Sequence, residues 1–521
     1  SRAPPPPSLR TTGGGAAMSC CRRLLAAWLL LLHPVAAAAA AGKEGCPAGA
    51  ACLSAADPGP QYPWPAVRGR AESYSISPHR VPKGWEKTLA WTFPGARGNH
   101  STVFNGGVAI DDERNVYTAA VDCIYKLNEH GVILWLYPVA TSTTPMLYKG
   151  ALYSNSKDGR VFALDMKSGT VIWSSKVCER IGGDIASVGV SDGVVVSSSD
   201  SPGFEGDGKV LGLNATSGEV LWTYSAEAQL WNFMPMFTGE GTFVFQDQIG
   251  GVYHLETATG KVRWTAGYKG VWTETWSDGV AMVGPNRMVY VVHADCRYQG
   301  FSTYPACTPT SPGTVRAYRL DSGELAWSQQ TPYSPNSQPV VVKLGKSSKL
   351  SVVLPVGIPA GLPPSLMIFG VPYLPMGLKS LIHQFSIWLG DSQTWLWRNT
   401  RNPSVVQAYD AETGEKQWSW TPPDLVRGYS AGDEELLIPR IRFGAPQHIC
   451  IPNLWASPTV DADGKIIVSH ANGKIYAFKD DNEDGVIDPP TEVVEYDTEV
   501  AFGHPGAGLA EGMMVTVNCD R

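Results

Sequence analysis

Residues 159–173 decide the fold, and they run Gly-Arg-Val-Phe-Ala-Leu-Asp-Met-Lys-Ser-Gly-Thr-Val-Ile-Trp. The alternation around Val161 and Ala163 is typical of a half-buried strand. Asp165 and Gly169 then bound a tight turn, because an Asp side chain hydrogen-bonds its own backbone and Gly accepts a positive φ. The strand after the turn ends in Trp173. The stretch therefore predicts a β-hairpin that carries a Trp at a defined position.

The same spacing of Asp or Asn, Gly and Trp recurs along the chain. Further copies end at Trp222, Trp264, Trp327 and Trp418, and a shortened copy ends at Trp135. Another short strand precedes most copies, so each unit has about four strands in roughly 45 residues, which is typical of propeller blades. The alternative, a set of unrelated hairpins in a β-sandwich, does not explain the constant offset from Gly to Trp.

The ends of the repeat array determine the expected number of blades. Residues 475–478 and 491–496 form a seventh hairpin without Trp, after the six that end in Trp. Residues 87–93 are a lone outer strand, and residues 512–517 are a lone inner strand, so the two chain ends would share an eighth blade and leave no exposed edge. We therefore expect an all-β, eight-bladed β-propeller of four-stranded antiparallel blades. We interpret the stop at Arg521 as a C-terminal truncation.

Composition excludes two broad classes of protein. The formal net charge is −7, which argues against a nucleic-acid binder. The hydrophobic fraction of 43% argues against general disorder.

The N-terminal residues predict entry into the secretory pathway. Residues 18–41 contain Arg22, an apolar stretch and small residues before Ala41, which together are typical of a cleaved signal peptide. The alternative is an uncleaved signal anchor. Residues 1–17 are interpreted as a non-native leader, and residues 42–84 as a Cys/Pro-rich segment. We expect a secreted protein with no stable membrane span after cleavage.

Cysteines and sequons are consistent with secretion. The even number of cysteines outside the signal peptide indicates disulfides in an oxidising compartment. Two sequons, at Asn99 and Asn214, predict glycosylation. The expected disulfides are Cys46–Cys52, Cys296–Cys307 and Cys123–Cys519, with Cys178 and Cys450 as alternative partners in the last.

Residues 345–402 do not follow the repeat. The part from Leu354 to Leu389 is Pro-rich and apolar and has neither strand alternation nor helix caps. One interpretation is a lid over the propeller face. The favoured one is non-native sequence such as an untrimmed intron, because a long apolar loop is unusual in a compact domain. The prolines disfavour a transmembrane hairpin.

The repeat resembles the pyrroloquinoline-quinone (PQQ) repeat, with its pattern Ala-x-Asp-x-x-x-Gly-x-x-x-Trp. The resemblance covers about residues 85–521 and implies an eight-bladed propeller with Trp docking. It leaves the function open, because such propellers occur in PQQ-dependent dehydrogenases, in a bacterial outer-membrane assembly lipoprotein that binds partner proteins, and in luminal stress-sensor domains.

The dehydrogenase residues implied by the resemblance are only partly present. Such enzymes have two adjacent cysteines above the cofactor, but here the only adjacent pair lies in the signal peptide. Trp272 and Trp276 are candidates for a cofactor floor, although buried Trp more often serves packing. His293 and Asp295 are candidates for an acid–base pair, although two residues apart on a strand they merely share one face. PQQ is therefore not expected.

The sequence predicts two functions from different classes. The preferred one is a secreted, non-enzymatic scaffold that binds a protein or glycan partner. The alternative is a quinone-dependent alcohol or sugar dehydrogenase. A hydrolase or lyase has no residues to support it.

A calcium loop is predicted at residues 480–488. Asp480, Asn482, Asp484 and Asp488 place oxygens at alternating positions, and the carbonyl of Val486 adds one, in a spacing similar to EF-hand and integrin-type hairpin loops. The EF-hand pattern is broken because its twelfth position is Thr, not Glu, so the hairpin type fits better. The alternative is a solvated acidic turn.

Overall fold

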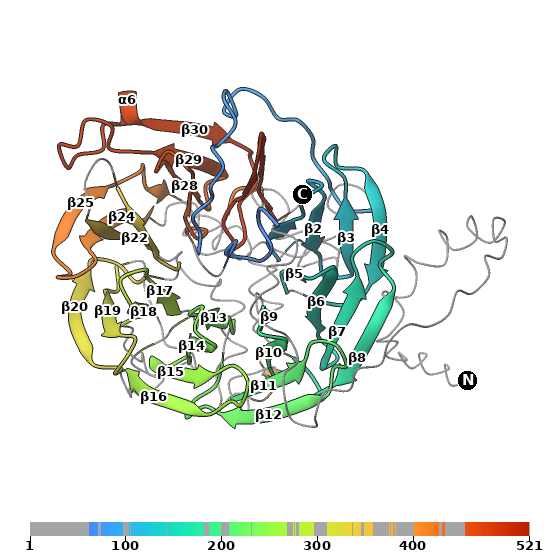
Figure 1. Cartoon of the computed structure of the whole chain (residues 1–521). Helices are drawn as coiled ribbons and strands as arrows, with labels where there is room; N and C mark the ends of the chain where they lie inside the picture. Colours follow the sequence, from blue (N-terminus) through green and yellow to red (C-terminus); the bar gives the residue numbers. More distant parts are fainter. Residues whose placement is uncertain are drawn as a thin grey trace, which may run out of the picture.

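The computed structural model arranges the chain as a ring of antiparallel sheets (Figure 1). Most strands follow one another in sequence order within each sheet, as in a propeller. The residues described are 62–70, 74–96, 106–181, 187–199, 208–267, 281–295, 310–357, 401–432 and 454–519, apart from short gaps within these ranges, with a few isolated positions elsewhere.

Seven sheets have four strands each, and in each sheet the first strand is the inner one and the last strand is the outer one. The first three blades consist of β1 (Val108–Ile110), β2 (Val116–Ala119), β3 (Cys123–Leu127) and β4 (Ile133–Pro138); β5 (Met146–Tyr148), β6 (Ala151–Ser156), β7 (Arg160–Asp165) and β8 (Val171–Lys176); and β9 (Gly189–Ser191), β10 (Val194–Ser198), β11 (Lys209–Asn214) and β12 (Val220–Ser225).

The remaining blades follow the same order, and the sixth has a crossover past β23. They consist of β13 (Met236–Phe237), β14 (Thr242–Gln246), β15 (Gly251–Glu256) and β16 (Val262–Gly267); β17 (Ala281–Val283), β18 (Met288–Ala294), β19 (Gly313–Arg319) and β20 (Leu325–Thr331); β21 (Val340–Lys343), β22 (Leu350–Val356), β24 (Val405–Asp410) and β25 (Lys416–Trp420); and β27 (Thr459–Val460), β28 (Ile466–Ser469), β29 (Lys474–Phe478) and β30 (Val493–Asp497).

The minor elements lie outside these blades. Strands β23 (Arg401–Asn402) and β26 (Leu425–Val426) pair with each other, and the helix α6 (Pro489–Glu492) precedes β30. Within the segment 345–402, residues 350–356 form β22 of the sixth blade, and most of the rest lies outside the described residues. No helix among the described residues has the length and apolar character that a membrane span requires.

The prediction of eight blades is wrong, because the described structure has seven four-stranded blades. The last two strands, β31 (Gly508–Ala510) and β32 (Met513–Val515), pair only with each other. Residues 87–93 were expected to supply the outer strand of an eighth blade, but they form no strand. No strand among the described residues pairs with residues 87–93. The backbone N–H and C=O groups of this segment therefore do not extend a sheet. The seven-bladed ring is instead completed by the pair β31–β32 against β1.

The predicted role of the repeated Trp is confirmed. Each docked indole N–H donates to a backbone carbonyl in the turn of the following hairpin, and this bond joins neighbouring units. The donor–acceptor pairs are Trp91–Glu129 at 2.8 Å, Trp135–Met166 at 3.0 Å, Trp173–Ala215 at 2.8 Å, Trp222–Thr257 at 2.9 Å, Trp264–Leu320 at 2.7 Å and Trp327–Ala411 at 3.0 Å.

The turn Gly is required beneath each docked indole. Gly169 has φ +71°, and a Cβ added there would lie 2.8 Å from Cδ2 of Trp135. The residue must therefore be Gly for two reasons, the left-handed backbone and the close approach of the ring. In the same hairpin the register shifts between Ala163 and Leu164, a β-bulge that recurs in the first six blades and is not recorded in the pairing of β29 with β30.

Candidate functional site

Residues 62–70 and 74–79, which Figure 1 draws in blue, lie against inner strands of the ring. Trp64 pairs with Ile110 at the end of β1, and the Tyr74 hydroxyl donates to the Phe237 carbonyl of β13 at 3.0 Å. Ser75 and Ser77 exchange backbone hydrogen bonds with Val460 of β27. The segment therefore contacts inner strands from opposite parts of the ring. Sequence reasoning missed this role, because contacts so distant in sequence leave no periodic pattern.

Arg68 is the most deeply buried charge of this segment. Its side chain is 2% exposed, and its Nη2 donates to Ser457 Oγ, while no partner within the described residues accepts from its Nε. Burial lowers the pKa of Arg68 to about 9. Ser457 in turn donates to Gln338 Oε1 at 3.1 Å. These residues precede β27 and β21, so the guanidinium joins the N-terminal segment to the sixth and seventh blades.

The arginine also affects the neighbouring His504. Burial, and then repulsion by the Arg68 charge, lowers the pKa of His504 to about 3. The imidazole is therefore neutral at physiological pH. Arg68 is therefore the charged group of this cluster.

The candidate acid–base pair is brought together in the fifth blade. His293 Nε2 lies 3.2 Å from Asp295 Oδ1, and Thr314 donates to the same carboxylate at 2.7 Å. His293 is only 1% exposed, and burial lowers its pKa. Burial raises the pKa of Asp295, but the hydrogen bonds from His293 and Thr314 outweigh it and leave that pKa lowered. Arg316 Nη1 lies 3.2 Å from His293 Nε2, so the pair is part of a larger polar cluster.

The predicted calcium loop is curled around its own carboxylates. Asp480 accepts hydrogen bonds from the backbone N–H groups of Asp484 at 3.2 Å and Gly485 at 3.0 Å. Glu492 accepts from Asp481 at 2.8 Å and from Asp488 at 2.9 Å. Among the described residues no three His, Cys, Asp or Glu side chains are placed to hold a metal ion. The calcium site at Asp480, Asn482, Asp484, Val486 and Asp488 therefore remains a prediction.

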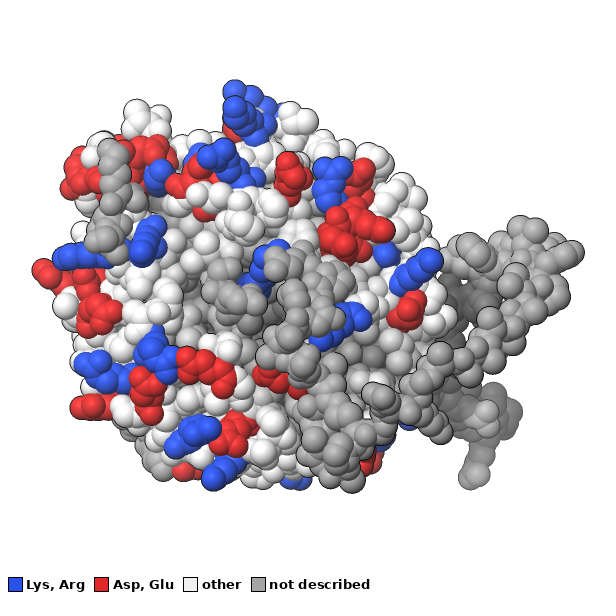
Figure 2. Space-filling view, in the orientation of Figure 1, with Lys and Arg blue, Asp and Glu red and all other residues white. Residues whose placement is uncertain are grey.

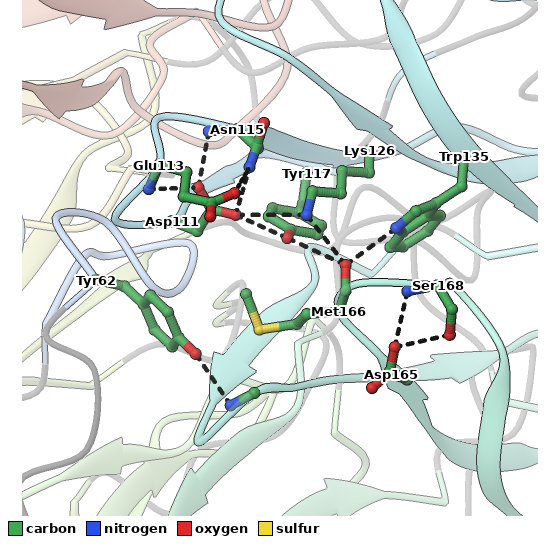
Figure 3. A network of polar contacts seen from close by, with 11 residues as sticks. Tyr62, Asp111, Glu113, Asn115, Tyr117, Lys126, Trp135, Asp165, Met166 and Ser168 are labelled. Atoms are coloured by element: carbon green, nitrogen blue, oxygen red, sulfur yellow. Dashed lines mark hydrogen bonds and ion pairs between the residues drawn. The ribbon is translucent and has the colours of Figure 1, made fainter.

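A buried polar network joins the first two blades (Figure 3). Lys126 Nζ lies 3.7 Å from Asp111 Oδ2, and the Tyr117 hydroxyl donates to the same carboxylate at 2.9 Å. The carbonyl of Met166 accepts from Lys126 Nζ at 3.1 Å and from the Trp135 indole at 3.0 Å. Burial, and then the charge of Asp111, raises the pKa of Tyr117 far above its usual value, so the phenol remains a donor. This network joins the first two blades through the Met166 carbonyl.

The predicted disulfide Cys123–Cys519 is wrong. Cys123 is buried on the first residue of β3 and carries a thiol, and Cys178 is also a thiol. Cys519 is therefore not bonded to Cys123. The other considered partner, Cys450, and the pairs Cys46–Cys52 and Cys296–Cys307 lie outside the described residues.

Several further predicted residues also lie outside the described part of the chain. They are Trp272, Trp276 and the sequon at Asn99. The second sequon residue, Asn214, is the last residue of β11, and its Oδ1 accepts the Thr216 N–H at 2.8 Å. Glycosylation at both positions stays a prediction.

The face of the ring in Figure 2 carries both signs of charge. Basic and acidic side chains alternate around the rim, as where Arg287 pairs with Glu240 and Asp321. An acidic patch lies over the loop that precedes α6. No large field of one sign covers the described part of this face.

We expect the stability of the protein to fall below pH 6.5 through His254. This side chain is 8% exposed and lies 2.7 Å from Thr242 Oγ1, and burial, then the charge of Arg263, lowers its pKa to about 4. The unfolded chain takes up a proton near pH 6.5, whereas the folded chain does so only near pH 4, so stability is complete above this window and is lost within it. The free energy of unfolding, measured with urea from pH 8 to pH 4, should fall less steeply with decreasing pH in His254→Gln than in the wild type. The difference in slope should correspond to about one bound proton. Equal slopes for variant and wild type would contradict the assignment.

Comparison with known proteins identifies the repeat. A family model described as outer membrane protein assembly factor BamB matches residues 83–230 and 206–353. The serine/threonine-protein kinase AfsK of Streptomyces griseus is 33% identical over 126 residues, which are 23% of this chain and 15% of that protein. The chain spans 15% and 25% of the lengths of the two curated relatives that it matches.

One solved structure has a similar fold, and a second matches with a lower score. The quinohemoprotein alcohol dehydrogenase from Comamonas testosteroni has a TM-score of 0.51 at 12% identity, over 87% of this chain and 75% of that one. BamB from Moraxella catarrhalis has a TM-score of 0.45 at 14% identity, over 78% of this chain and 92% of that one. Because the family model covers more than half of the sequence, the chain belongs to the PQQ-repeat β-propeller family described as outer membrane protein assembly factor BamB.

Proposed function

We propose that the protein is a secreted, non-enzymatic propeller that binds a protein or glycan partner on its rigid ring. The observation that supports this most directly is that residues 62–70 and 74–79 pack against inner strands of the first, second, fourth and seventh blades. A cofactor bound on the axis would compete with Arg68, Trp64 and Tyr74 for the same space. The residues of the chain therefore do not fit PQQ at this position.

A quinone-dependent dehydrogenase is the second candidate, and one observation favours it. His293 is buried and in contact with the half-buried Asp295, as an acid–base pair would require. Against it stand Arg316, which lies over the imidazole, and the lack of adjacent cysteines after the signal peptide.

Reconstitution distinguishes the two functions. The full-length protein is incubated with PQQ and calcium and desalted, and the retained quinone absorbance is recorded together with dye-linked oxidation of ethanol and glucose. We expect neither retained absorbance nor turnover. Stoichiometric retention of the quinone with turnover would overturn the scaffold and establish the dehydrogenase.

We also propose that calcium binds the loop 480–488 in a structural role. The loop oxygens accept backbone N–H groups, and the five carboxylates of residues 480–488 repel one another. An ion that binds only the folded loop stabilises it by mass action. We expect millimolar calcium to raise the melting temperature by several degrees over excess EDTA.

Asp484→Ala should abolish this calcium dependence. A suitable control is Asp497→Ala, which removes an exposed carboxylate of β30 outside the loop. If the melting temperature in EDTA equals that in calcium, and Asp484→Ala changes neither value, the loop binds no calcium.

A further inference from the structure

Trp418 differs from the other repeat tryptophans because its docking partner is missing. It ends the motif of the sixth blade, and the next hairpin, β29–β30, has the loop 480–488 in place of the short turn with Gly. No acceptor among the described residues is recorded for its indole N–H, whereas six other indoles each donate to a turn carbonyl.

Gly485, the glycine of this loop, does not lie against the indole of Trp418. A Cβ added at Gly485 would meet only the carbonyl oxygen of Gln417, at 3.8 Å, within 4 Å. The corresponding Cβ at Gly414 would meet the Trp327 ring at 2.6 Å. The space that a turn fills at other blade interfaces is therefore left open beside Trp418.

A cavity of about 270 Å³ lies in this space, between the sixth and seventh blades. These blades are neighbours in the ring, with β25 next to β28 and β29 in Figure 1. Residues of contrasting chemistry line the cavity. They include Trp418, Ile466, Gln417, Lys479, Asp480 and Glu483.

The lining combines an apolar surface with both kinds of hydrogen-bonding group. Trp418 and the 1% exposed Ile466 supply the apolar part. Lys479 is a donor that is held only loosely by Asp481, at 3.6 Å, and the carboxylates of Asp480 and Glu483 are acceptors. An aromatic face beside a few polar groups is the usual composition of a small-molecule site.

We propose that this cavity binds a saccharide, with one sugar ring against Trp418, one hydroxyl accepting from the Trp418 indole N–H, and other hydroxyls on Lys479 and Glu483. A hydroxyl both donates and accepts, so it satisfies an ammonium and a carboxylate side by side. The volume is at the small end of ligand sites, which suits one ring and not a large cofactor. The inference rests on the proposed function, because it names the glycan as the partner.

Titration of simple sugars tests this site. The full-length protein is titrated with the methyl glycosides of glucose, galactose, mannose and N-acetylglucosamine while Trp fluorescence and heat are recorded. We expect saturable binding of at least one glycoside, and a loss of affinity of tenfold or more in Trp418→Phe, which loses the indole N–H. Glu483→Gln should weaken binding severalfold.

Glu415→Gln is the matched control, because Glu415 is exposed in the preceding turn and does not line the cavity. It should bind as the wild type does. If Trp418→Phe does not fold, Glu483→Gln and Gln417→Ala decide the question. The proposal is overturned if no glycoside saturates, or if these lining variants bind as tightly as Glu415→Gln.

The two proposals fail in different ways. Absence of sugar binding together with absence of PQQ retention removes the cavity as a site and leaves the scaffold. PQQ-dependent turnover together with sugar binding that depends on Trp418 removes the scaffold and leaves the cavity.

Discussion

Replacement of Trp173 by Ala is expected to lower the free energy of unfolding by about 3–5 kcal/mol. The side chain is 8% exposed and packs between the second and third blades, and its indole donates to the Ala215 carbonyl at 2.8 Å. The substitution leaves a cavity at a blade interface and a carbonyl without its donor. Urea unfolding followed by near-ultraviolet circular dichroism measures the loss.

Two smaller changes separate the contributions of this interface. Trp173→Phe keeps most of the packing and removes the indole donor, so it should cost about 1–2 kcal/mol. Gly218→Ala inserts a Cβ against the Trp173 ring, whereas Gly150→Ala adds one at the same kind of positive φ with no atom within 4 Å. We expect Gly218→Ala to be the more destabilising by about 1–3 kcal/mol. Equal effects would show that the docked indole does not depend on the glycine.

The second large effect is expected at Asp111. This carboxylate is paired with Lys126, whose side chain is only 9% exposed, and it accepts from Tyr117 and from the Asn115 N–H at 2.8 Å. Asp111→Ala leaves a buried ammonium without its anion, which costs about 3–5 kcal/mol. Thermal and urea unfolding at neutral pH measure the loss.

The double variant Asp111→Ala, Lys126→Met tests the cause of this loss. If the uncompensated charge dominates, the double variant is more stable than Asp111→Ala alone, because the buried ammonium is gone. Lys126→Met alone should cost less, since its main loss is the hydrogen bond to the Met166 carbonyl. Additive effects of the two substitutions would show that the residues act independently.

Local patterns predicted the blades well. Asp165, Gly169 and Trp173 determine a hairpin through interactions within a few residues, and the docking of Trp173 on the next repeat follows from regular spacing. The predicted number of blades was wrong because the sequence of residues 87–93 resembles that of an outer strand with its Trp. Trp91 docks as expected, but the segment has no neighbouring strand.

The candidate sites depend on contacts that the sequence does not signal. Arg68 and Ser457 are 389 residues apart, and no repeat relates them. His293 and Asp295 were noticed because they are close in sequence, while Arg316 comes from the next strand. The cavity beside Trp418 was also missed. Its signal was the replacement of the usual turn by residues 480–488, which we interpreted only as a calcium loop.

The N-terminal segment also affects how the protein folds. A chain of repeats that contact only their neighbours can melt piece by piece, because its stability is a sum over adjacent units. Residues 62–70 and 74–79 contact the first, second, fourth and seventh blades, so their contacts are complete only when the ring is assembled. They precede the blades in the chain but dock last, which makes folding slow. In return, loss of any one of these four blades removes part of their binding surface, so unfolding is expected to be a single cooperative event.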